Sequence, residues 1–446
     1  MSPSQAEKVK TGFWSLSQDK VSKIFFYLLI LFLPTQLGKH FWPNFSFVFG
    51  LRLDYLSPTF YFTDFLILAI FIFSLGSFLK SLIKIKTVSL ILFIVFLISL
   101  MGGILFSISH SAGWYGFIKL IEFSFLAFYV KNNFNLFKKE IIFACFLAGI
   151  VFEASLSLFQ FFNGGSLNSF LYFLGERTFT SQTPGIANAS INGQLVLRPY
   201  GTFSHPNVLA GYLIIAMLYL LLFFSKKIKR FFLFLGIAFG TASLLLTFGR
   251  MAIFLWTAYL VLLFRFLIPE KYKKELSNLR IVLFLSIFIF FFLFIFFFFQ
   301  NSFFFQRFLS TKLSDEPVIQ RQELISESLI MFAKNPVFGV GLNNFFYNIN
   351  YLSLEKKTML IQPVHNIFLY TLSQTGLTGI FFLTYILFRS FKNILKKASS
   401  KEKAYLLMGL FSVIFLGMFD HYFLTIQQGQ ILLTLIIGIS LSYKKT

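Results

Sequence analysis

The feature that most constrains this chain is a series of long apolar segments, which recur along its 446 residues. A helix that crosses the hydrocarbon core of a bilayer needs roughly 20 mostly apolar residues. Hydrophobic residues make up 57% of the chain and charged residues 13%, whereas soluble globular proteins carry about 25% charged residues. The sequence therefore predicts an all-α, polytopic membrane protein.

We place about twelve transmembrane helices. They are residues 24–38, 58–79, 87–107, 115–130, 141–162, 205–224, 231–248, 251–268, 281–300, 363–388, 404–420 and 424–442. The apolar run from Phe231 to Phe264 is divided into two spans, because it would extend about 50 Å as one helix and the hydrocarbon core is about 30 Å thick. A turn at Gly249–Arg250 separates these two spans.

The basic residues predict the orientation of the chain. Alternate loops and both termini hold 27 of the 39 Lys and Arg residues but only six of the 17 acidic residues. Loops rich in Lys and Arg face the cytoplasm, so we expect a multi-pass protein of the plasma (inner) membrane with both termini in the cytoplasm. This topology accounts for the net charge of +22, and we therefore expect no nucleic acid partner.

Two loops on the opposite, outer side are long enough to carry chemistry, at about 163–204 and 301–362. In the second loop, Asp315-Glu316-Pro317 is typical of a helix start and Asn335-Pro336 of a helix end. An amphipathic helix carrying Arg321 is predicted between them. The sequence Gly339-Val340-Gly341 then allows the backbone to approach another segment closely.

The motifs that are missing limit the chemistry. The chain has no phosphate-binding loop, no dinucleotide fingerprint, no HExxH pair and no Asp-x-Asp pair. Its single cysteine, Cys145, excludes an intramolecular disulfide and a thiolate metal cluster. We therefore expect no cofactor and no metal. An enzyme on the outer face would need a substrate that is already activated, such as a lipid-linked sugar pyrophosphate.

Arginine and histidine residues are predicted to gather on the outer face. A guanidinium binds phosphate oxygens in a bidentate fork and can stabilise a leaving pyrophosphate; Arg198, Arg250 and Arg321 are the candidates. Arg250 occupies the tight turn between two spans, although an arginine there can also extend to lipid headgroups. His365, which is followed by Asn366, is a candidate general base; the alternative is a histidine that is hydrogen-bonded at a helix start.

Four stretches, taken together, resemble the O-antigen ligase and O-antigen polymerase family of bacterial envelope proteins. They are Arg198-Pro-Tyr-Gly-Thr-Phe-Ser-His-Pro-Asn207 with Leu209-Ala210-Gly211, Leu246-Thr-Phe-Gly-Arg250, Arg321 with Asn335-Pro336 and Gly339-Val-Gly341, and His365-Asn366 with Gly376-Leu377 and Gly379. The resemblance covers about residues 198–380. Gly249 and Met251 depart from the Ser and small residue that often flank the turn arginine in the family.

The resemblance implies a glycosyltransferase-C-like bundle with a large outer loop between spans nine and ten. It divides the chain into four parts: a cytoplasmic tail (1–23), the N-terminal transmembrane helices with the first long outer loop (24–197), the catalytic core with the outer loop 301–362 (198–388), and the last cytoplasmic loop with the last two spans (389–446). The implied partners are an undecaprenyl-pyrophosphate-linked glycan donor, a glycan or lipid-core acceptor and the lipid bilayer.

By the same resemblance, Arg250 and Arg321 would hold the pyrophosphate and His365 would deprotonate the acceptor in a metal-independent, inverting transfer at the outer face. The other residues implied to shape the cavity are Arg198, His205, Asn207, Asn366 and His421. The stretch Asp420-His421-Tyr422, with the glutamines after it, favours a polymerase over a ligase, in the biosynthesis of a cell-envelope polysaccharide such as lipopolysaccharide.

Other interpretations remain open. Twelve spans with both termini inside would also suit a polysaccharide flippase or transporter, but no internal repeat supports one. A glycosyltransferase-C enzyme with a carboxylate base would need a prominent acid in the outer loop between the first two spans, where only Asp54 is present. Lys119 and Glu122, three residues apart, are predicted to pair on one helix face, and Glu153 and Gln160 are predicted mainly to support packing.

Overall fold

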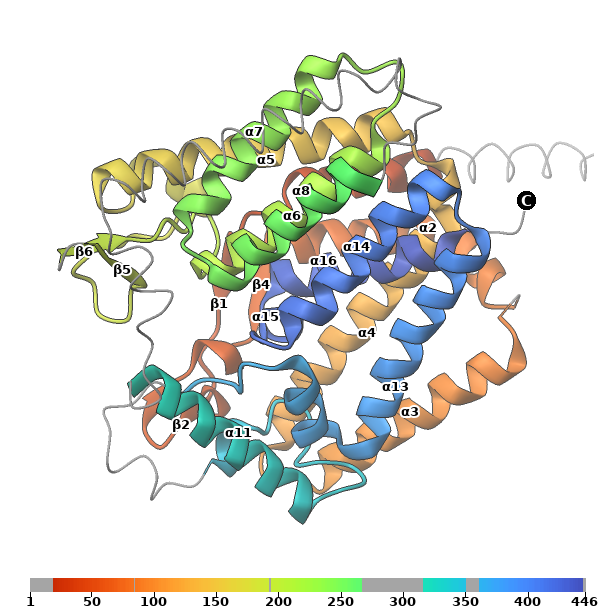
Figure 1. Cartoon of the computed structure of the whole chain (residues 1–446). Helices are drawn as coiled ribbons and strands as arrows, with labels where there is room; N and C mark the ends of the chain where they lie inside the picture. Colours follow the sequence, from red (N-terminus) through yellow and green to blue (C-terminus); the bar gives the residue numbers. More distant parts are fainter. Residues whose placement is uncertain (1–18, 84, 192–193, 267–315, 350–360, 444–446) are drawn as a thin grey trace, which may run out of the picture.

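The computed structural model describes residues 19–83, 85–191, 194–266, 316–349 and 361–443. Within these residues the chain is mostly helical, as the sequence predicts (Figure 1). The helices are residues 19–31, α2 (Phe62–Leu82), α3 (Thr87–Leu105), α4 (His110–Asn133), α5 (Lys139–Asn163), α6 (Pro206–Phe223), α7 (Arg230–Leu246), α8 (Arg250–Phe266), α11 (Glu316–Lys334), α13 (Ile367–Lys397), α14 (Ser400–Gly417), α15 (Tyr422–Thr425) and α16 (Gln427–Ser442).

Five of the described helices are long and apolar enough to cross a membrane: α2, α3, α5, α6 and α13. α7, α16 and the first part of α8 are shorter apolar helices. Every predicted span on described residues overlaps a helix, but two of them differ from the prediction. The helix of the first span ends at residue 31 and not at 38, and the last span, 424–442, is broken at Ile426 between α15 and α16. The predicted ninth span, 281–300, lies outside the described residues. These are the helices of a membrane protein; the count of twelve spans and the glycosyltransferase-C-like bundle stay predictions.

The helices form two neighbouring groups, which meet where α6 packs against α14 (Figure 1). α6 packs against α5, α7 and α14, and 94% of its apolar stretch is buried, so it is a central helix of the bundle. α16 packs against α4 and α13. α2 and α3 are only 28% buried and expose many large apolar side chains, as expected for helices that contact lipid, because lipid tails are as apolar as these side chains.

Short strands interrupt the all-α pattern in the loops. They form three antiparallel pairs, which are β1 (Gly38–His40) with β4 (Thr59–Tyr61), β2 (Phe47–Val48) with β3 (Leu51–Arg52), and β5 (Asn188–Ile191) with β6 (Gln194–Leu197). Each pair lies before or between helices and joins segments that are near in sequence. The strands therefore shape the loops without adding a layer to the bundle.

The predicted turn between the two spans of the 231–264 run is confirmed. α7 ends at Leu246 and α8 begins at Arg250. In the turn, the backbone of Phe248 adopts a positive φ of 50°, and the Thr247 hydroxyl accepts a hydrogen bond from the backbone N–H of Gly249 at 3.2 Å. Arg250 is therefore the first residue of the helix that follows the turn, as the sequence indicates.

The predicted helix in the second long outer loop is also confirmed, as α11. It begins at Glu316, ends at Lys334 and carries Arg321 on an exposed face. Its inner face buries Ser328 and Met331. Residues 301–315 and 350–360 of the predicted loop lie outside the described residues.

The segment after α11 is fixed to α13 through backbone contacts. The backbone N–H groups of Val340 and Gly341 donate to the carbonyls of Ser373 and Gln374, both at 2.9 Å. α13 is interrupted at Gly376, whose φ is 60°.

Glycine is required on both sides of this contact. A Cβ on Gly339 would collide with the backbone of Gln374, and a Cβ on Gly376 would collide with the carbonyl of Val337. Both glycines also have positive φ, which L side chains adopt at a cost. The close backbone approach predicted from the glycines after α11 is confirmed, and it fixes α11 relative to the start of α13.

Candidate active site

The loop between β6 and α6 is held in place by two buried polar side chains of α5. Glu153 accepts hydrogen bonds from the backbone N–H and the hydroxyl of Thr202, at 2.9 and 2.6 Å. Gln160 accepts from the backbone N–H of Gly201 at 2.8 Å and donates to its carbonyl at 3.0 Å. Both side chains are completely buried. They position the loop, which agrees with the supporting role predicted for them.

A chain of hydrogen bonds links this loop to two other parts of the bundle. Arg198 donates from Nε to the carbonyl of Thr247 in the α7–α8 turn and from Nη2 to Oδ1 of Asn207, both at 2.7 Å. Asn207 in turn donates from Nδ2 to Oδ2 of Asp420 at 3.0 Å. His205 caps α6, because its Nδ1 accepts from the backbone N–H of Asn207 at 3.1 Å. Residues far apart in sequence thus meet around Asp420.

Two of the predicted histidines lie next to each other at this point. The rings of His365 and His421 are 5.2 Å apart, centroid to centroid, and nearly perpendicular. The Nδ1 atom of His421 is 2.7 Å from the hydroxyl of Thr425. Asp420 accepts a hydrogen bond from the backbone N–H of His421 at 2.8 Å. Among the described residues, Nδ1 of His365 is buried and has no hydrogen-bond partner.

Burial keeps the imidazoles neutral. It lowers the pKa of His421 to about 4 and of His205 to about 3, against the opposing charge of Asp420. Burial also lowers the pKa of His365. The charge of Arg321 adds to this decrease, and the charge of Asp420 opposes it. A neutral imidazole at neutral pH can accept a proton, as a general base must.

Arg321, Arg250 and Asn366 take different positions. Arg321 of α11 lines the same cavity as His365, and its charge acts on that imidazole. Arg250 begins α8, three residues after the carbonyl that binds Arg198. Asn366 caps α13: its Oδ1 accepts from the first backbone N–H groups of the helix, and its Nδ2 donates to the Met418 carbonyl at 3.2 Å. Asn366 therefore orients the segment that carries His365.

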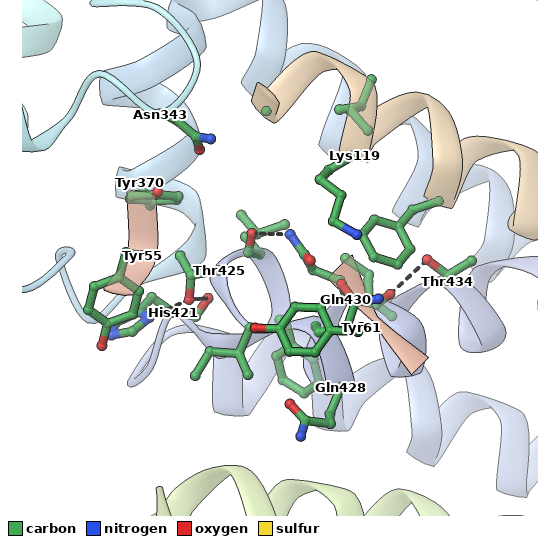
Figure 2. Close-up of a pocket in the computed structure, with 18 of the residues that line it drawn as sticks. Tyr55, Tyr61, Lys119, Asn343, Tyr370, His421, Thr425, Gln428, Gln430 and Thr434 are labelled. Carbon is green, nitrogen blue, oxygen red and sulfur yellow. Dashed lines mark hydrogen bonds between the residues drawn. The ribbon is translucent and has the colours of Figure 1, made fainter. Parts of the chain in front are cut away.

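A large cavity of about 1230 Å³ contains most of these groups. His205, Asn207, Arg321, His365, Asp420 and His421 all line it. Figure 2 shows a close-up of a pocket in this region, with His421 beside Thr425 and Tyr55. Of the three arginines predicted from sequence, Arg321 lines the cavity. Arg198 and Arg250 are not among its lining residues in the part of the chain that the structure describes.

Sequence reasoning missed several lining residues. Asp420 stood next to a predicted residue but was not itself selected, and Tyr55, whose ring lies 5.5 Å from that of His421, was not considered. Arg52 and Arg177 also line the cavity, and Arg52 lies 4.4 Å above the ring of Trp42. These residues belong to loops without periodic patterns, so only the presence of arginine on the predicted outer side could have indicated them.

The cavity has a second, apolar region away from the histidines. Its walls come from the loop-distal parts of α2, α3, α13 and α16, and include Phe78, Leu82, Phe93, Phe96, Phe382 and Ile437. A single cavity therefore joins charged and aromatic groups at one end to an apolar channel at the other. This combination suits an amphipathic molecule with a long apolar tail.

No group of three or more His, Cys, Asp or Glu side chains within the described ranges is arranged to hold a metal ion. The hydrogen-bonding and charged groups of the cavity are guanidinium, imidazole, carboxylate, amide and hydroxyl groups. The expectation that the site needs no metal stays a prediction.

Comparison with known proteins bears on the same region. The chain matches no curated protein. The sequence model of the O-antigen ligase family matches residues 235–384, which include Arg250, Arg321, His365 and Asn366. This stretch lies inside the 198–388 core predicted from the motifs. In this stretch the chain is therefore similar to the O-antigen ligase family, as the motifs predict.

Proposed function

We propose that this protein extends or attaches a polysaccharide carried on undecaprenyl pyrophosphate, at the outer face of the plasma membrane. The observation that carries the proposal is the position of His365. Its neutral imidazole lies beside His421 and Asp420 in a cavity that Arg321 also lines. A base and a phosphate-binding cation that share one cavity are the two groups that glycosyl transfer from a pyrophosphate needs.

In the proposed reaction, His365 accepts the proton of an acceptor hydroxyl. The acceptor oxygen forms a bond to the anomeric carbon of the donor sugar, and the bond from this carbon to the pyrophosphate oxygen breaks with its electron pair. One displacement inverts the configuration at the anomeric carbon. Arg321 stabilises the negative charge on the leaving pyrophosphate; Arg250 assists from the α7–α8 turn, which Arg198 connects to the site.

The shape of the cavity supports a lipid-linked substrate. Its apolar region, lined by phenylalanines of α3 and α13, suits a polyprenyl chain, and its polar region suits sugars and pyrophosphate. Burying a long apolar chain contributes roughly 0.8 kcal/mol for each CH₂ group. A transporter for the same glycan would need the cavity but not a base with an unoccupied nitrogen, so the arrangement of His365 favours transfer.

The test uses the purified protein in lipid nanodiscs, supplied with undecaprenyl-pyrophosphate repeat units and a separate acceptor. Because general base catalysis contributes about 10²–10⁴-fold, we expect His365→Ala to lower the rate by at least about 100-fold while the protein remains folded. A ladder of products from the wild type indicates a polymerase, and a single added block indicates a ligase. Full activity of His365→Ala, or loss of activity only in Asp420→Asn, would reject the histidine base and favour a carboxylate base.

A further inference from the structure

A polar chamber adjoins the histidines within the same cavity. It lies between α4, α13 and α16. In Figure 2, Lys119 from α4 and Gln430 and Thr434 from α16 lie around this space. Amide side chains are unusually frequent among its walls, which is unexpected between apolar helices.

Two of these amides are oriented by the protein but only half satisfied. Oε1 of Gln374 accepts a hydrogen bond from the backbone N–H of Asn343 at 2.7 Å, which fixes the amide. Nε2 of Gln427 donates to the Thr63 hydroxyl at 3.1 Å and to Asp64. Among the described residues, Nε2 of Gln374, which acts on the hydroxyl of Tyr370, and Oε1 of Gln427 have no hydrogen-bond partner within 3.5 Å.

These unpaired atoms require an explanation, because both glutamines are only 3% exposed. A buried polar group without a partner costs about 1–3 kcal/mol, and nearly all such groups in proteins are satisfied. One unpaired atom is a donor and the other is an acceptor. A ligand hydroxyl, which both donates and accepts, can satisfy either of them.

The charges of the chamber exclude a phosphate as its natural occupant. Lys119 and Gln427 both contact Asp64, and Nζ of Lys119 is already paired with Asp64 at 2.8 Å and with Glu122 at 2.9 Å. Two carboxylates around one ammonium leave no excess positive charge. Nearby aromatic rings, Tyr61 and Tyr370, offer apolar faces. Paired charges, free amide groups and aromatic faces together match an uncharged sugar.

We propose that this chamber binds a neutral sugar unit of the acceptor glycan and thereby selects the acceptor. The inference rests on the proposed function and deepens it. Gln374 lies seven residues along α13 from Ile367, which corresponds to about 10 Å of helix. This distance exceeds the width of one sugar ring, so the bound unit is a neighbour of the sugar whose hydroxyl reaches His365.

The experiment measures equilibrium binding to the full-length protein in nanodiscs. The probes are the oligosaccharide released by mild acid from the organism's own lipid-linked glycan, and inorganic pyrophosphate. Gln374→Glu keeps the oxygen that accepts from Asn343 but replaces the unpaired donor. Gln374→Met, of similar volume, is the second variant if the first does not fold. Asn132→Asp is the matched control, because Nδ2 of Asn132 is likewise buried and unpaired but Asn132 is not among the described lining residues.

We expect both Gln374 variants to bind the oligosaccharide at least about tenfold more weakly, and to raise the Michaelis constant for the acceptor but not for the donor. Asn132→Asp should bind like the wild type, and pyrophosphate binding should not change in any variant. Unchanged oligosaccharide binding, or weakened pyrophosphate binding instead, would overturn the inference.

The two proposals fail separately. His365→Ala should bind the oligosaccharide as tightly as the wild type, because it leaves the chamber intact. If this variant keeps full activity, the proposed function fails and the binding result still decides the inference. If the wild type makes product but shows no saturable oligosaccharide binding, the inference fails and the proposed function stands.

Discussion

Two buried polar clusters lie close together in this bundle, and they differ in how completely their charges are paired. The lysine cluster comprises Asp64, Lys119, Glu122 and Gln427. Its ammonium contacts two carboxylates, although Oε1 of Glu122 and Oε1 of Gln427 have no partner among the described residues. The histidine cluster comprises Asn207, His365, Asp420 and His421, and one imidazole nitrogen in it has no described partner. Intramembrane charges are functional candidates by default. The ion pairs of the lysine cluster indicate that it supports the fold, whereas the unpaired nitrogen of His365 leaves the histidine cluster able to accept a proton.

The largest expected effect on stability is in the lysine cluster. Lys119→Met would leave two buried carboxylates without their cation, and breaking a buried ion pair in this way costs about 3–5 kcal/mol. We expect a marked fall in the thermal unfolding temperature. Size-exclusion chromatography of the protein after heating measures this temperature. An unfolding temperature equal to that of the wild type would show that the cluster does not support the fold.

A smaller effect, on rate rather than stability, is expected in the histidine cluster. Burial lowers the pKa of His365 below the ordinary value of 6.5, and Asp420 partly offsets this shift. The base works when neutral, so activity should be lost only as the pH falls through a value below 6.5. Asp420→Asn removes the offset, which should move this acidic limb to lower pH and decrease kcat/KM about tenfold at neutral pH.

The measurement is the pH dependence of kcat/KM for the wild type, Asp420→Asn and Asp64→Asn. The last variant is the matched control, because it removes a buried carboxylate from the lysine cluster; it should lower stability and leave the acidic limb in place. An acidic limb that does not move in Asp420→Asn would contradict the assignment of His365 as the base that Asp420 tunes.

The smallest effect is expected from an ion pair outside both clusters. Lys139 and Glu402 are 2.9 Å apart, and the side chain of Lys139 is 51% exposed. Exposed pairs contribute about 0–1 kcal/mol, so Lys139→Met should change the unfolding temperature little. A loss as large as that of Lys119→Met would mean that burial does not distinguish the two pairs.

Much of the fold could be predicted, because membrane spans follow from length and hydropathy. The turn before Arg250 follows from an apolar run too long for one span, and α11 follows from its start and end signals. The pairing of Lys119 with Glu122 follows from their spacing on one helix; the contact of Lys119 with Asp64 does not, because it joins α4 to α2.

The candidate site could be predicted in part. His365, His421 and Arg321 were selected from sequence, and the structure brings them to one cavity. Loop packing decides the rest. It determines that Arg250 is not among the residues that line the cavity, and that Asp420, Tyr55 and Arg177 are. Loop packing joins residues that are hundreds of positions apart, as in the bond from Asn207 to Asp420, and no local pattern encodes it.

The backbone contact between the segment after α11 and the break in α13 makes one exchangeable unit of α11, the segment that follows it and α13. Gly339 and Gly376 face each other's chain without using a side chain, so other side chains in the unit can vary between relatives while the distance from Arg321 to His365 is kept. A chimaera that takes this whole unit from a relative should retain the geometry of the reacting groups. One that takes α11 without the start of α13 should lose it.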